Sequence, residues 1–167
     1  MIVFDSRPSG GQSDVFIMSA DGGLPRNLSN HPATDTVPTW SRDGRFIYFH
    51  SNRSGSGQVW KMRAGGSNPQ QITRQGGFIA YESVDGAAIF YGKTDTFVSS
   101  LWTAGADCGN ERMLVPTLYR HNLAPTKSGV YLPPREDWKE GRKSCSMRLP
   151  IRRPGPCIAC PDVWRWV

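Results

Sequence analysis

The feature that most constrains this chain is an internal repeat, which recurs about three times within its 167 residues. Asp43-Gly44 recurs as Asp85-Gly86, and Trp60 recurs as Trp102 at the same interval. A further turn-forming pair, Ser128-Gly129, follows Asp85 at almost that interval and precedes a short apolar run. In such repeats each unit buries its apolar surface against its neighbours. The chain is therefore expected to fold as a row of similar units stacked side by side.

The first two units match each other segment by segment. Residues 2–7 correspond to residues 47–53, because both are apolar runs that end in serine and arginine. Residues 14–20 correspond to residues 58–64, and Gly-Gly pairs follow both segments. This correspondence defines which positions are equivalent in neighbouring units.

Each unit has the pattern of four short β-strands joined by tight turns, with no helical periodicity. Asp-Gly pairs supply the positive φ angles that a hairpin turn needs between the first and second strands. A four-stranded antiparallel unit at this period is typical of a β-propeller blade, whereas solenoid repeats of similar length are helical. In the second unit the strands are predicted at residues 36–40, 45–51, 58–64 and 69–73.

We therefore predict an all-β fold, an incomplete β-propeller of about three four-stranded antiparallel blades followed by an irregular C-terminal tail. The first blade is expected to lack its innermost strand, because Met1 stands where later units have a strand and an Asp-Gly turn. Closed propellers use about four to eight blades, so this chain alone is not expected to form a ring. Self-association through unpaired blade faces would follow. The predicted blades are residues 1–34, 35–76 and 77–118, with the start of a fourth at 119–134 and the tail at 135–167.

The predicted tail differs from the repeats in composition. Residues 135–167 carry eight Lys or Arg and four Asp or Glu, so +4 of the net charge of +6 lies there. Translation of a GC-rich gene in a shifted frame is one explanation for this segment rich in Arg, Pro and Cys, and a genuine basic tail is the other. The remaining residues are close to neutral, so binding of nucleic acid through the propeller region is not expected.

Residues 37–53 resemble the repeat motif of TolB-like, WD-repeat-like propellers. That motif reads approximately Pro-x-Trp-Ser-Pro-Asp-Gly, then an apolar strand, then Ser-x-Arg, and here Arg42 stands where the family usually has proline. Residues 76–86 are similar to a blade junction in propellers attached to bacterial transcription regulators. The resemblance covers residues 2 to about 134 and implies the propeller fold.

The residues that carry the repeat are expected to be structural. The repeated tryptophans are predicted to pack between blades rather than to form an aromatic ligand platform. The serine, aspartate and arginine positions at strand ends are predicted to tie one blade to the next, with ligand contact at the channel rim as the alternative. The predicted structural motif consists of Trp40, Ser41, Asp43, Gly44, Ser51, Arg53, Trp60, Asp85, Gly86 and Trp102.

Motifs for catalysis or metal binding are not evident in the sequence. The histidines His31, His50 and His121 share no metal-binding spacing. The tail offers three cysteines, Cys145, Cys157 and Cys160, where a structural zinc site needs four ligands. Nucleophile-elbow, dinucleotide-binding and phosphate-loop motifs are also missing. We therefore predict no catalytic residues, no metal and no cofactor, and the sequence does not identify ligand-binding residues.

The function predicted from these features is that of a non-catalytic β-propeller module for protein–protein interaction or ligand sensing, with an unidentified protein partner. The resemblance implies bacterial relatives in which such propellers face the periplasm or form the sensory end of a membrane-bound regulator. The alternative is the gating propeller of a serine peptidase of the prolyl-oligopeptidase or tricorn kind, or of a sugar lyase, with the catalytic part elsewhere. The sequence shows no signal peptide and no apolar run long enough for a membrane span, and it does not fix the compartment.

Overall fold

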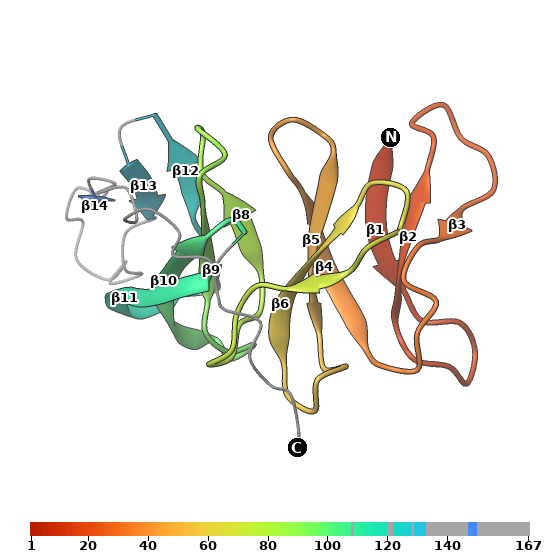
Figure 1. Ribbon diagram of the computed structural model, residues 1–167, viewed down its shortest axis with the longest axis horizontal. Coiled ribbons are helices and arrows are strands. Elements are labelled where there is room, and N and C mark those ends of the chain that lie inside the picture. Colours follow the sequence, from red (N-terminus) through yellow and green to blue (C-terminus); the bar gives the residue numbers. More distant parts are fainter. Residues whose placement is uncertain (108, 120–121, 128, 133–146, 150–167) are drawn as a thin grey trace, which may run out of the picture.

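A computed structural model of the chain describes residues 1–107, 109–119, 122–127, 129–132 and 147–149. All the regular secondary structure of these residues is β, arranged in sheets whose neighbouring strands run antiparallel (Figure 1). Among them no helix is long and apolar enough to cross a membrane. The strands are β1 (Ile2–Ser6), β2 (Asp14–Met18), β3 (Arg26–Asn27), β4 (Asp35–Trp40), β5 (Phe46–Ser51), β6 (Gln58–Arg63), β7 (Gln70–Gln71), β8 (Ala80–Glu82), β9 (Ala88–Gly92), β10 (Val98–Gly105), β11 (Gly109–Tyr119), β12 (Ala124–Thr126), β13 (Gly129–Leu132) and β14 (Met147–Leu149).

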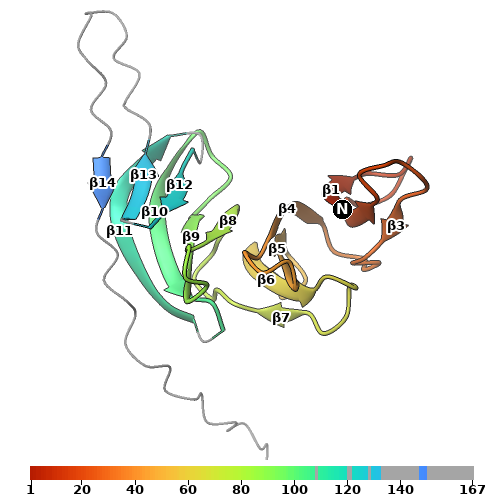
Figure 2. The same ribbon diagram turned by 90° about the horizontal axis from the view of Figure 1, so that it is seen from above.

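The strands form four sheets, which we call the first to the fourth blade: β1–β2–β3, β4–β5–β6–β7, β8–β9–β10–β11 and β12–β13–β14. Viewed from above, the blades lie along an open arc with β4, β8 and β12 on its inner side (Figure 2). The prediction of an incomplete propeller is therefore confirmed. The first blade has three strands, and β1 corresponds to the second strand of the next blade.

Both faces of β5, the second strand of the second blade, are largely buried. Along β5, Ile47 and Phe49 join a cluster with Val15 and Ile17 of the first blade. Tyr48, which lies between them in sequence, joins the cluster on the opposite face with residues of the third blade. Because successive side chains of a strand point to opposite faces, a continuous apolar run places its strand between two neighbouring blades.

The fourth strand of the second blade is shorter than predicted. β7 covers only Gln70–Gln71, where the sequence pattern suggested residues 69–73. Beyond it, the backbone N–H groups of Ile72 and Thr73 both donate to the carbonyl oxygen of Val59. The Thr73 hydroxyl accepts from the N–H of Val59 at 2.8 Å, so a side chain replaces the regular ladder.

One strand lies in the segment predicted to be irregular. β14 pairs antiparallel with β13, with Leu149 opposite Val130 and Met147 opposite Leu132. A three-residue strand is too short for its alternation to stand out in a sequence. The rest of the predicted tail, including Cys145, Cys157 and Cys160, lies outside the described residues, as do Cys108 and His121.

Gly66 lies where the second blade closely approaches the first. It has φ +89°, and a Cβ atom there would lie 2.7 Å from the carbonyl oxygen of Leu28. We expect Gly66→Ala to lower the free energy of unfolding by roughly 2–5 kcal/mol, about 1–2 from the left-handed backbone and about 1–3 from displacement of Leu28.

Gly22→Ala is the matched control for this substitution in urea unfolding. Gly22 has φ +98°, but a Cβ atom there would meet nothing within 4 Å. Only the backbone cost of about 1–2 kcal/mol is therefore expected. Equal losses of stability in the two variants would contradict close packing between the blades at Gly66.

Candidate functional site

The turn between β4 and β5 is held by a side-chain network around Asp43. The Ser41 hydroxyl donates to Asp43 Oδ1 at 2.7 Å and accepts from the N–H of Phe46 at 2.9 Å. The N–H of Arg45 donates to the same carboxylate oxygen at 3.0 Å, across Gly44 with φ +68°. Hydrogen bonds from the Arg45 backbone and then from the Ser41 hydroxyl hold the pKa of Asp43 well below its usual range.

The same network recurs in the third blade. Ser83 donates to Asp85 Oδ1 at 2.6 Å and accepts from the N–H of Ala88 at 3.0 Å. The N–H of Ala87 donates to Asp85 Oδ1 at 3.2 Å, and Gly86 has φ +72°. Ser83 lies outside the predicted motif set, although it stands one full repeat after Ser41. In both blades the aspartate therefore stabilises the turn between the first and second strands.

Arg53 and Asp35 form a buried ion pair inside the second blade. Arg53 donates from Nη2 to Asp35 Oδ2 at 2.7 Å and from Nε to Ser51 Oγ at 2.9 Å. Its guanidinium carbon lies 5.1 Å from the ring centroids of both Phe49 and Trp60. The side chains of Arg53 and Asp35 are 9% and 0% exposed. The hydrogen-bonding partners of Ser51 and Arg53 thus belong to their own blade, while the guanidinium covers aromatic rings that face the first blade.

A cation also lies over the repeated tryptophan of the third blade. Lys93 Nζ is 3.7 Å from the ring centroid of Trp102 and 3.9 Å from Glu111 Oε2. Burial lowers the pKa of Lys93, and the nearby Glu111 carboxylate opposes this shift. Trp102 packs beside the cluster between the second and third blades, and Trp40 and Trp60 pack beside the one between the first and second.

Glu82 is a buried carboxylate that joins the second and third blades. It accepts the Tyr48 hydroxyl at 2.7 Å on Oε1 and the N–H of Arg42 at 2.6 Å on Oε2. Burial, and then the hydrogen bond to Glu82, raise the pKa of the Tyr48 phenol. Sequence reasoning did not identify Glu82. The available signal was its position one full repeat after Trp40, where a charged residue replaces an apolar one.

Lys61 makes a second polar contact between these blades. Its Nζ donates to Asp107 Oδ1 at 2.5 Å and to the carbonyl oxygen of Ala106 at 3.3 Å. The same ammonium lies 4.2 Å from the ring centroid of Phe46. The side chain of Lys61 is 7% exposed, so its charge serves cohesion of the blades rather than binding at the surface.

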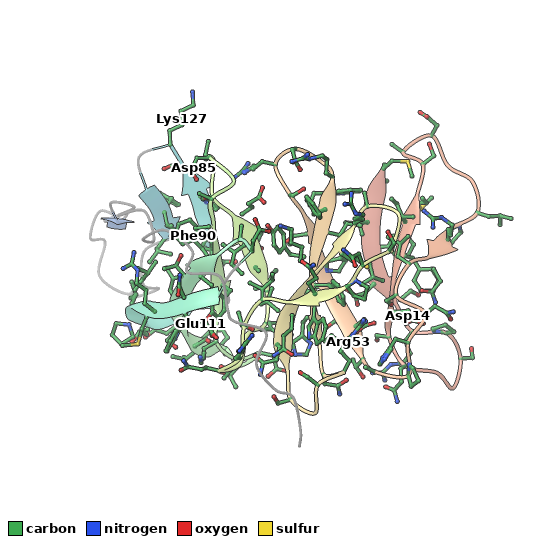
Figure 3. The ribbon with its side chains drawn as sticks, in the orientation of Figure 1. Asp14, Arg53, Asp85, Phe90, Glu111 and Lys127 are labelled. Carbon is green, nitrogen blue, oxygen red and sulfur yellow. The ribbon has the colours of Figure 1, made fainter. Side chains whose placement is uncertain are left out.

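The turns of three blades lie on the same side of the arc, which is its upper side in Figure 1, and we call this side the turn end: residues 42–45, 84–86 and Lys127. Asp85 and Lys127 both project at this end in Figure 3. Arg42 Nη2 lies 3.4 Å from the carbonyl oxygen of Pro125, so the second blade reaches the fourth. Val84 is 37% exposed beside these charged groups. Several blades thus contribute charged side chains to one exposed surface.

Among the residues that the structure describes, no group of three or more His, Cys, Asp or Glu side chains could hold a metal ion. His31 and His50 lie in different parts of the fold. The Nδ1 atom of His31 accepts from the N–H of Ala33, and Nδ1 of His50 lies 3.3 Å from the Thr36 hydroxyl.

Comparison with known proteins identifies relatives for most of this chain. The family model described as TolB beta propeller domain matches residues 2–132. The Tol-Pal system protein TolB of Bordetella pertussis is 39% identical over 57 residues, which are 34% of this chain and 13% of that protein. The matched segments cover 13% to 20% of the length of the first curated relatives.

Two solved structures have the same arrangement of strands. A putative TolB from Agrobacterium tumefaciens matches with a TM-score of 0.62 and 26% identity, over 71% of this chain and 46% of its own. TolB from Acinetobacter baumannii matches with a TM-score of 0.67 and 21% identity, over 81% of this chain and 35% of its own. The second likeness establishes the fold alone.

The buried ion pair in the second blade gives a quantitative prediction. We expect Arg53→Met to lower the free energy of unfolding by about 3–5 kcal/mol, because it leaves the Asp35 carboxylate buried without its cation. Adding Asp35→Asn removes that uncompensated charge, so the double variant should be less destabilised than the sum of the single variants. A double-mutant cycle in urea measures this coupling, and strict additivity would rule out the ion pair.

His50 gives a prediction for pH dependence. Burial lowers the pKa of His50 from its ordinary value of 6.5, so the unfolded chain binds more protons below that value than the folded chain does. Stability contributed by His50 is therefore present above about pH 6.5 and is lost as pH falls from there towards the folded pKa. Melting temperatures between pH 7.5 and 5 should fall less steeply for His50→Gln than for the unmodified chain. His31→Gln is the control, and an equal flattening in that variant would argue against His50.

Proposed function

This chain belongs to the TolB β-propeller domain family, and on that basis we propose that it is a non-catalytic module whose turn end binds a protein partner. The observation that carries the proposal is that the buried ionisable side chains are engaged in contacts within or between blades. Asp35, Lys61 and Glu82 are buried and bonded within or between blades. Their chemistry is therefore committed to holding the propeller together.

The turn end supplies what a protein-binding surface needs. Arg42, Asp43, Arg45 and Asp85 are exposed there, and so is the apolar side chain of Val84. Arginine is favoured in protein interfaces, and a mixed-charge rim around apolar area is their usual organisation. The curated Bordetella relative is named as a protein of the Tol-Pal system, which supports a role in assembly with other proteins. This chain matches only part of that relative, so we define the partner only by the surface that it contacts, the turn end.

Site-specific photo-crosslinking tests this proposal. We would place a photo-reactive benzoylphenylalanine at Val84 on the turn end, or at Ser54 in the β5–β6 loop as a control. In a lysate of the native host, a discrete cross-linked protein is expected from Val84 and at least tenfold less from Ser54. Arg42→Glu should abolish the cross-link at Val84 without unfolding the chain, because Arg42 is exposed.

Two results would contradict the proposal. Equal cross-linking at Val84 and Ser54 would show that the turn end is not the binding surface. Turnover of peptide, ester or glycan substrates that a single serine or histidine substitution abolishes would show that the module is catalytic.

A further inference from the structure

Three cationic side chains surround the ring of Phe46 beside the turn end, and we call them the basic cluster. The Nζ atom of Lys61 lies 4.2 Å from the ring centroid, and the guanidinium carbons of Arg45 and Arg63 lie 5.8 and 6.0 Å from it. Phe46 is the first residue of β5 and lies opposite Arg63 in β6. The N–H of Ala64 donates to the carbonyl oxygen of Arg45 at 2.9 Å. The backbone thus holds three cations together, although like charges repel one another.

Two cations of the basic cluster have carboxylate partners. Arg45 donates from Nε to Asp43 at 2.5 Å. Lys61 donates from Nζ to Asp107, also at 2.5 Å. Arg63 is exposed, and its side chain makes no hydrogen bond or ion pair with another residue that the structure describes. One positive charge of the basic cluster is therefore left without an anion.

The position of Arg63 over the ring leaves its hydrogen-bonding edge free. A guanidinium has five N–H donors and no acceptor, and when it lies over an aromatic face its donors point outwards at its rim. Two parallel N–H···O bonds from such a rim bind a carboxylate. Phe46 is half-buried, so part of its ring offers apolar surface beside these donors. An acidic side chain matches both features, because its carboxylate fits the guanidinium and its methylene groups fit the ring.

We propose that the basic cluster binds an aspartate or glutamate in the segment by which the protein partner contacts the turn end. The carboxylate bonds to Arg63, and the methylene groups of the same side chain pack on the ring of Phe46. The inference rests on the proposed function of protein binding, and it adds the chemistry of the partner segment and the residues that receive it.

The carboxylates of the basic cluster favour an acidic peptide over a polyanion. The side chains of Asp43 and Asp107 are 43% and 77% exposed, next to the cations that they neutralise. Nucleic acids and anionic membranes present closely spaced phosphates, which bind where several Lys or Arg side chains gather. Such phosphates would be repelled by the two exposed aspartates. A segment that places single carboxylates on this surface avoids that repulsion.

The test is an NMR titration of the full chain with a blocked Gly-Glu-Ala-Glu-Gly peptide at millimolar concentration and low salt. Saturable shifts are expected at the Nε–H of Arg63 and at the backbone amides of residues 45–46 and 61–63. The Gly-Gln-Ala-Gln-Gly peptide should cause no such shifts. Arg63→Gln should weaken binding roughly fivefold, as followed by the amides of residues 45–46. Arg74→Gln is the matched control, because Arg74 is also exposed and lies in the loop between the second and third blades.

Charge reversal in the cross-linking experiment separates this inference from the proposed function. Loss of the cross-link from Val84 in Arg63→Glu but not in Arg74→Glu, together with the expected shifts, would support the inference. An unchanged cross-link from Val84 in Arg63→Glu would overturn the inference and leave the proposed function standing. Equal shifts with the two peptides would also overturn it. The same shifts at lower concentrations of a thymidine oligonucleotide or of phosphatidylglycerol vesicles would overturn it as well, because the basic cluster would then bind a polyanion.

Discussion

The rest of the structure depends on the burial of each blade's apolar strands between two neighbours. β5 shows this constraint most clearly, because Ile47 and Phe49 face the first blade while Tyr48 faces the third. A single blade would leave both of these faces in water, so the blades are stable only as a stack. The spacing of the turns is therefore fixed by packing between units as well as by folding within each unit.

Polar contacts add specificity to this apolar stack. Glu82 receives the Tyr48 hydroxyl from the neighbouring blade, and the Thr39 hydroxyl donates to the carbonyl oxygen of Ala80 at 2.5 Å. Between the first two blades, the N–H of Val37 donates to Asp5 Oδ1 at 3.0 Å. Burying a hydrogen-bonding group without its partner is costly, so such pairs favour one alignment of neighbouring blades over slipped ones.

Most of the fold could be predicted from the sequence, because the repeat period is marked by residues whose local chemistry specifies turns and buried strands. Asp43-Gly44 and Asp85-Gly86 mark turns that need positive φ, and the apolar run at 47–49 marks a buried strand. The site was less predictable. Asp35 and Glu82 each depend on a partner distant in sequence, so no local pattern identifies them. The serine and arginine at the end of β5 were recognised as a motif, but their carboxylate partner became visible only through the register of β4.

The measurement that tests this account most directly is native-state hydrogen exchange, residue by residue, on the whole chain. The account predicts that the amides of β5 and β9, buried between blades, exchange slowest and respond together to low concentrations of denaturant. The amides of β1 should exchange faster, because this strand is paired on one side among the described residues. Protection of β1 equal to that of β5, or independent opening of β5 and β9, would contradict the dependence of each blade on its neighbours.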